Sequence, residues 1–184
     1  MALAAACASA QKGRHAADAC RVVRGPLTAA DSAAQLAGDF SLTLRATSGP
    51  DSGRTAVGQL RLVPQDRALI PADGATQPLR GTAAIALETV GATRMGDLAA
   101  ADPADPGVGV YESRAPGTGV PTVVLRLGSG SNGRGPSPID AGHLTLFVAG
   151  ITSGGFAGSW SSSAGSTFPP HRAGGYFCAV RAPD

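Results

Sequence analysis

The sequence predicts one all-β domain, an antiparallel meander of about eight strands that forms a barrel or a two-sheet sandwich, with one short N-terminal helix. Three observations support this fold class. Glycine and proline are abundant, at 26 and 14 residues, as in chains of many short strands joined by tight turns. Charged residues are only 15% of the chain. Apolar residues at every second position recur from residue 38 onward.

The N-terminal segment precedes the strands. Residues 1–25 are rich in Ala and have no sustained apolar period, so they predict a flexible lead or tether. The single β domain is expected at 26–184. Its first expected element starts at Thr28, which is followed three residues later by Asp31 in a spacing close to a capping box. We therefore expect a short helix at 28–37.

Alternating apolar and polar residues predict the strands in order. In the first strand Phe40, Leu42 and Leu44 alternate with polar neighbours, and a Gly/Pro/Asp turn leads to a matching return strand. The following candidates repeat this pattern. The predicted strands are 38–46, 56–62, 79–89, 108–112, 122–127, 143–148, 155–162 and 174–181.

The connections between these strands favour a meander. No helix-length segment separates the strands after residue 37, so antiparallel neighbours are expected. Eight strands fit a closed barrel filled by small side chains, and they fit a two-sheet sandwich nearly as well. Three connections are longer than a hairpin requires, namely 64–78, 90–107 and 128–142. Unusually long loops often carry function.

One glycine-rich segment matches the Gly-x-Gly-x-x-Gly pattern of dinucleotide-binding sites. Residues 128–133 read Gly-Ser-Gly-Ser-Asn-Gly directly after a predicted strand. Dinucleotide sites need a helix to begin there, so that its N-terminus faces the pyrophosphate. Residues 134–138 contain two prolines and a glycine, which prevent a helix. We interpret the segment as a hairpin connection and predict no cofactor.

The remaining chemistry-bearing residues form no recognisable pattern. His15, His143 and His171 lack partners at ligand spacing, so no metal site is predicted. There is no Gly-x-Ser-x-Gly motif, and nothing selects a carboxylate pair for glycoside hydrolysis. The net charge is +2 without a basic stripe, which argues against a nucleic-acid partner. The sequence therefore predicts a non-enzymatic protein without catalytic residues.

The N-terminus predicts export. Leu3 to Cys7 reads Leu-Ala-Ala-Ala-Cys within an Ala-rich stretch. It resembles the lipobox of bacterial lipoproteins, in which the chain is cleaved before a cysteine that becomes lipidated. The resemblance implies a periplasmic or extracellular protein that is anchored to the membrane through Cys7. An ordinary Ala-rich terminus is the alternative interpretation.

The chain has three cysteines. Cys20 precedes the folded region and Cys178 lies in the last predicted strand, so a disulfide between them would tie the lead to the sheet. This pairing leaves Cys7 unpaired, as a lipidated residue would be. Three unrelated thiols, with Cys178 as a small buried side chain, are the alternative.

The most distinctive segment lies in the seventh predicted strand, where glycines alternate with aromatic residues and Gly158 stands two residues before Trp160. This Gly-x-Trp is similar to the signature of lipocalin and avidin-like barrels. In those families the motif lies in the first strand, and its Trp closes one barrel end against a late Arg. The resemblance implies a closed barrel, with Arg172 or Arg181 as that Arg. Four aromatic residues are expected in the core: Phe156, Trp160, Tyr176 and Phe177.

These observations predict an extracytoplasmic interaction or structural protein, an extrinsic subunit that docks on a membrane-associated complex. The pattern is similar to that of extrinsic β-subunits on the periplasmic face of bacterial membrane complexes, photosynthetic reaction-centre and antenna assemblies among them. A lipocalin-like barrel that binds a small molecule is the alternative. Expected partners are proteins at the membrane surface, and the membrane itself through the anchor. Partner contacts are expected at loop residues Arg94, Asp97, Asp102, Asp105 and Arg134.

Overall fold

The chain folds into eight antiparallel strands and two short 3-10 turns. The strands are β1 (Gly38–Ser48), β2 (Thr55–Leu69), β3 (Thr76–Ala84), β4 (Val108–Arg114), β5 (Pro121–Leu127), β6 (His143–Thr152), β7 (Gly155–Ala164) and β8 (His171–Arg181). The turns are η1 (Ala33–Leu36) and η2 (Leu87–Val90). This computed structural model describes residues 25–69, 76–92, 107–114, 117, 119–127, 143–164 and 171–183.

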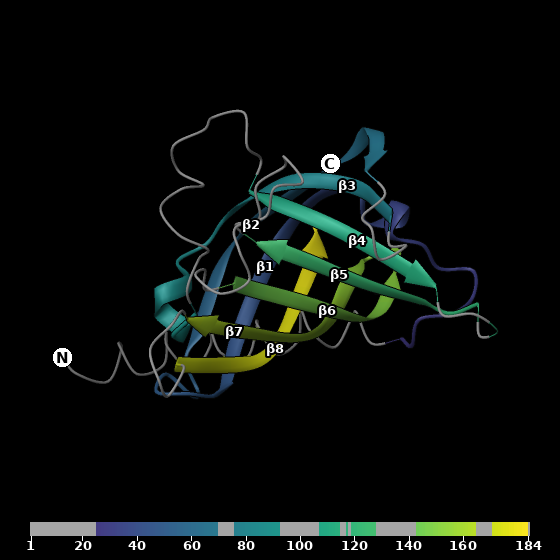
Figure 1. Ribbon diagram of the computed structural model, residues 1–184. Coiled ribbons are helices and arrows are strands. Elements are labelled where there is room, and N and C mark those ends of the chain that lie inside the picture. Colours follow the sequence, from purple (N-terminus) through teal and green to yellow (C-terminus); the bar gives the residue numbers. More distant parts are fainter. Residues whose placement is uncertain are drawn as a thin grey trace.

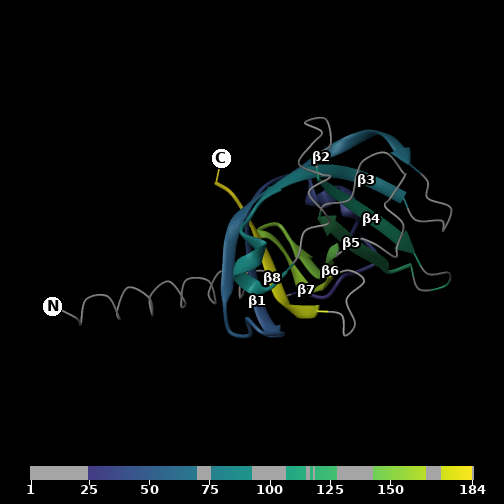
Figure 2. The same cartoon turned by 60° about the vertical axis from the view of Figure 1, so that its left-hand side comes forward.

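The strands form a closed barrel in sequence order, as Figures 1 and 2 show. Each strand pairs with its neighbour along the chain, and β8 returns to pair with β1 from Phe40–Arg181 to Ser48–Gly174. The predicted all-β meander is confirmed. Of the two predicted architectures, the barrel is the one observed, because the first and last strands pair directly.

The predicted helix at 28–37 is wrong in length and type. Only Ala33–Leu36 is helical, as the 3-10 turn η1, and Ser32 caps it by accepting a hydrogen bond from an amide two residues on. The chain before η1 is tied to the barrel wall, since the Leu27 N–H donates to the Ala149 carbonyl at 3.2 Å. The Asp31 N–H bonds back to the Thr28 carbonyl in a separate turn, and Ser32 is extended with φ −147° and ψ 150°, so no helix continues from Thr28 into η1.

The third predicted strand, 79–89, begins and ends later than the observed one. β3 ends at Ala84, and the chain then turns inward as η2. Leu87 keeps the phase of Ile85, as a continued strand would, but Val90 does not. Both are buried by η2, which contacts β1 and β2. Two apolar residues at spacing three share one face of a 3-10 turn, whereas in a strand they would point to opposite faces.

The predicted loop at 64–78 is mostly strand. β2 continues to Leu69, and the ladder pairs Pro64 with Leu79 and Leu69 with Gln77. The register shifts between these two pairs, and a bulge of this kind accommodates a proline in a strand.

Inward-facing side chains fill the barrel. One layer, traced by the strand register from β3 to β7, consists of Leu79, Val110, Leu125, Leu146 and Trp160. Each of these side chains is no more than 2% exposed. Phe156 also packs edge-on against Phe40 and Phe177, with ring centroids 5.1 and 5.9 Å apart. The interior is therefore a continuous apolar core.

Glycines allow the strands to bend around this core. A Cβ atom at Gly81 would lie 1.9 Å from the Arg61 carbonyl oxygen, and one at Gly158 would lie 1.9 Å from that of Phe147. No other residue fits at such distances, so these positions mark sharp bends of the barrel wall.

The two 3-10 turns lie at opposite ends of the barrel, η1 in purple and η2 in teal in Figure 1. We name these ends the η1 end and the η2 end. The start of β1 and the end of β8 lie at the η1 end, whereas the connection from β3 to β4 leaves from the η2 end.

Candidate functional site

The loop residues predicted to bind a partner lie outside the described residues. They are Arg94, Asp97, Asp102, Asp105 and Arg134. The strands that bracket their loops are described, and in a meander every second connection falls at the same end. The β3–β4 and β5–β6 connections therefore both begin and finish at the η2 end. The barrel topology thus starts and ends both loops at one end of the barrel, although the loops are far apart in the sequence.

Among the described residues, the β1–β2 turn and η2 pack together at the η2 end. Gly91, which ends η2 with φ 67°, packs so closely on the turn that an added Cβ would lie 2.9 Å from an Asp51 carboxylate oxygen. Asp51 also pairs with Arg54 at 3.0 Å, and the Arg54 side chain is 63% exposed. The β3–β4 connection thus starts from a fixed position beside an exposed ion pair.

The η1 end is closed by a network of ionised side chains. Glu112 accepts hydrogen bonds from the Ser32 hydroxyl at 3.1 Å and the Ala33 N–H at 2.7 Å, at the start of η1. Arg114 donates to the other oxygen of Glu112 at 3.0 Å, and also to three main-chain carbonyls. Because every contact of Glu112 holds the fold together, this carboxylate is a structural group.

Arg181 fastens η1 from the opposite side. Its guanidinium lies 4.9 Å from the centroid of the Phe40 ring and donates to the carbonyls of Ala37 and Gln35 at 3.0 and 3.3 Å. Gly38 lies beneath it, where a Cβ would be 2.4 Å from an Arg181 nitrogen. The sequence Gly38-Asp39-Phe40 at the start of β1 thus packs against Arg181 and closes the η1 end of the barrel.

Trp160, whose Gly-x-Trp sequence resembles the motif of lipocalin-like barrels, does not close this end. Trp160 is 2% exposed inside the barrel, where its indole N–H donates to the Arg45 carbonyl at 3.2 Å. The prediction that Trp160, Phe156 and Phe177 belong to the core is confirmed. Tyr176 was also expected there, but it faces outward and is 38% exposed.

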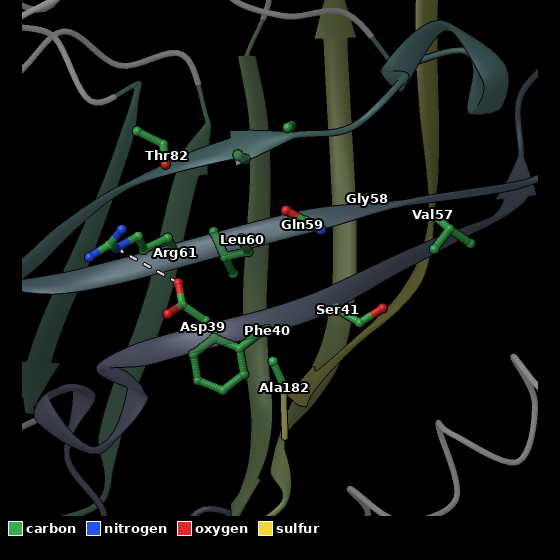
Figure 3. Close-up of a pocket in the computed structure, with 12 residues that line it drawn as sticks. Asp39, Phe40, Ser41, Val57, Gly58, Gln59, Leu60, Arg61, Thr82 and Ala182 are labelled. Atoms are coloured by element: carbon green, nitrogen blue, oxygen red, sulfur yellow. Dashed lines mark ion pairs between the residues drawn. The ribbon is translucent and has the colours of Figure 1, made fainter. Parts of the chain in front are cut away.

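A groove of about 690 Å³ lies on the outside of β1, β2 and β3 (Figure 3). Asp39 and Arg61 face one another across it at 3.7 Å, and both side chains are about two-thirds exposed or more, at 66% and 70%. Its other lining residues include Ser41, Gln59 and Thr82. The described groove therefore offers polar contacts and one solvated ion pair.

Cys178 carries a disulfide. Its predicted partner, Cys20, lies outside the described residues, as does Cys7. Cys178 faces outward, since its neighbours Phe177 and Ala179 face the core, yet it is only 2% exposed. The disulfide thus sits on the outer wall of β8.

Two aromatic side chains on the outer wall were missed by sequence reasoning. Phe147 in β6 and Tyr176 in β8 are 44% and 38% exposed. The register places Ser159 of β7 between them, in one row across three strands. The sequence could have indicated that Phe147 faces outward, because in β6 it alternates with Leu146 and Val148, which are buried.

No group of three or more His, Cys, Asp or Glu residues in the described part of the chain could hold a metal ion. His143 and His171 begin β6 and β8, and His15 lies outside the described residues. No helix among the described residues has the length and apolarity needed to cross a membrane.

Comparison with known proteins gives no assignment. No family model, curated protein or solved structure matches this chain. The function must therefore be argued from the barrel itself.

Proposed function

We propose that this protein is a non-enzymatic extracytoplasmic interaction protein, an extrinsic subunit that docks on a membrane-associated protein complex through the connections at its η2 end. A photosynthetic reaction-centre or antenna assembly is an example of such a complex. The observation that carries the proposal is the packed interior, because a filled barrel is a scaffold and leaves recognition to its loops and outer wall.

The interior supports this proposal over a lipocalin-like binder. The buried core side chains from Phe40 in β1 to Ala179 in β8 are at most 7% exposed, and Ala83 and Ile151 are partly buried against them. A ligand-binding barrel instead keeps an open volume of several hundred Å³, about 300–1,000. At the layer that contains Trp160, side chains already occupy the space that a ligand would need.

The connections at the η2 end have the chemistry of a recognition surface. The loops that follow η2 and β5 hold the charged residues predicted to meet a partner. They also contain Pro103, Pro106, Pro136 and Pro138. Prolines restrict the free loop, which lowers the entropy lost when a partner binds.

The disulfide of Cys178 supports an extracytoplasmic location. Structural disulfides persist in oxidising compartments and are rare in the cytosol. Lipidation of Cys7 is part of the same proposal, and intact-mass measurement of the protein from its host tests it. A mature chain that begins at an acylated Cys7 is expected, whereas unmodified Met1 or a free Cys7 thiol would refute the anchor.

The docking proposal is tested by replacing residues 92–106 or 129–138 with short Gly/Ser turns. The parent and both variants are purified from gently solubilised host membranes, and co-purifying proteins are quantified by mass spectrometry. We expect both variants to keep the parental urea midpoint and to lose the partner. Replacement of 115–118, which connects β4 and β5 at the η1 end, is the matched control and should retain it. Parental recovery of the partner by both loop variants would contradict the proposal.

A further inference from the structure

We infer that the outer wall of β5 to β8 and β1 is a second docking face, and that it contacts an anionic lipid surface. We call this face the aromatic wall. Its central row, set by the strand register, consists of Val124, Phe147, Ser159, Tyr176 and Arg45. The inference rests on the proposed function, since it names the side of the extrinsic subunit that faces the membrane.

The two rings are placed as interfacial anchors are. Phe147 and Tyr176 are 44% and 38% exposed and stand on either side of Ser159. Two strand spacings separate them, so their Cα atoms lie about 10 Å apart. In the register Phe147 lies between Val124 and Ser159, and Tyr176 lies between Ser159 and Arg45. Aromatic residues with one wet side favour the boundary between water and lipid.

The charges of the aromatic wall complement anionic headgroups. Arg45 lies directly beside Tyr176 in the β1–β8 ladder. Arg172 is exposed on β8, four residues before Tyr176 on the same face. Among the described outward residues of β5 to β8 the charged ones are both arginines, Arg126 and Arg172. Asp39 is the acid on β1, and it faces Arg61 at 3.7 Å, away from the rings.

The chain reaches the barrel on this same wall. Gly25, the first described residue, packs on Gly150 of β6, where a Cβ would lie 1.6 Å from the Gly25 carbonyl oxygen. Phe147 is three residues away on the same strand. Cys178, which carries the disulfide, shares the outward face of β8 with Tyr176. A lipid anchor upstream of Gly25 would therefore hold the aromatic wall toward the bilayer.

A lipid surface suits this wall better than a protein does. Protein interfaces have a contiguous, well-packed centre. Here the rings are separated by Ser159, and the described recess lies on the other side of Asp39, over β1 to β3. A fluid lipid surface can accommodate two separate rings that are flanked by arginines without a matching pocket.

Flotation with lipid vesicles tests the inference. The full chain with its disulfide intact, carrying Cys7→Ser to prevent acylation, is mixed with vesicles of phosphatidylcholine alone or with added phosphatidylglycerol. We expect binding to the anionic vesicles only, and its loss in high salt. The double variants Phe147→Ser/Tyr176→Ser and Arg45→Gln/Arg172→Gln should each reduce binding about tenfold. Val120→Ser is the control, because Val120 is 39% exposed but lies at the η1 end.

Several outcomes would overturn the inference. Binding to neither vesicle, equal binding to both, or parental binding by both double variants would each reject a lipid surface. If the double variants lose only the co-purifying protein, the wall is a protein interface instead. The variants with replaced 92–106 or 129–138 should bind vesicles normally, so this inference and the docking proposal can fail separately.

Discussion

Arg181 connects three parts of the chain that are far apart in sequence. It lies at the end of β8, stacks on Phe40 of β1 and donates to the carbonyls of Gln35 and Ala37, on and just after η1. A guanidinium can do all of this at once because it is planar and carries several donors. An ammonium group offers a point charge and cannot stack in the same way.

We therefore predict that Arg181→Lys destabilises the barrel by about 1–2 kcal/mol, because it loses the stacking and part of the hydrogen bonding. The urea midpoint measures this change. Arg61→Lys is the control, since its side chain is 70% exposed and forms one surface ion pair, and it should change stability by less than about 0.5 kcal/mol. Equal effects of the two substitutions would show that the contacts of Arg181 with Phe40, Gln35 and Ala37 do not stabilise the barrel.

Trp160 is the largest side chain of the packed interior. We predict that Trp160→Ala costs about 3–5 kcal/mol of unfolding free energy, the usual effect of deleting a large buried aromatic. Tyr176→Ala on the outer wall is the matched comparison and should stay within about 1 kcal/mol of the parent. A Trp160→Ala midpoint within error of the parent, at unchanged slope, would contradict the burial of Trp160.

Tyr176 shows why the sequence did not resolve every residue. The segment from Tyr176 to Val180 is apolar throughout, so alternation cannot reveal which residues face the core. Register with β1 decides it, because Phe177 pairs with buried Leu44 and Tyr176 pairs with exposed Arg45. Only the closed barrel supplies that pairing.

At the scale of elements, η1 depends on a residue eighty positions away. Glu112 bonds the Ser32 hydroxyl and the Ala33 N–H, while Arg114 fixes the other carboxylate oxygen. The Glu112 side chain is only 12% exposed, so these bonds are shielded from water. A turn of four residues has few internal hydrogen bonds, and this external cap stabilises it.

Glu112→Gln keeps the shape of the side chain but removes its charge. We predict a loss of about 1–2 kcal/mol in unfolding free energy, because the bonds from Ser32, Ala33 and Arg114 lose their charged acceptor. Hydrogen exchange should also accelerate at the Ala33 amide. Glu88→Gln in η2 is the control, since Glu88 is exposed. Unchanged exchange at Ala33 would mean that Glu112 does not hold η1.

Strand patterns were predictable where one face is apolar and the other is polar. The phase of β1, with Phe40, Leu42 and Leu44 inward, follows directly from the sequence and is confirmed. The end of β2 was missed because Pro64 suggests a loop, whereas the bulge between β2 and β3 accommodates it. The turn η2 was missed because Leu87 keeps the phase of the preceding strand.

At the scale of the whole molecule, the number of strands and their antiparallel order were predictable, but closure was not. A barrel and a sandwich share the same local alternation, and only the pairing of β1 with β8 separates them. The candidate loops were predictable from their length and composition. Their shared end, the groove beside Arg61 and the aromatic wall all depend on the closed topology.

The central claim is that side chains fill the barrel, so that binding occurs outside it. Val110 tests this most directly, because it lies in the layer that contains Trp160 and is 0% exposed. We predict that Val110→Phe lowers the free energy of unfolding by about 1–3 kcal/mol or more, as overpacking of a filled core does. Val57→Phe, at a position that is 61% exposed on the outside, should leave stability unchanged. A Val110→Phe variant as stable as the parent in urea would instead show that the interior holds an open cavity, and the packed-scaffold account would be wrong.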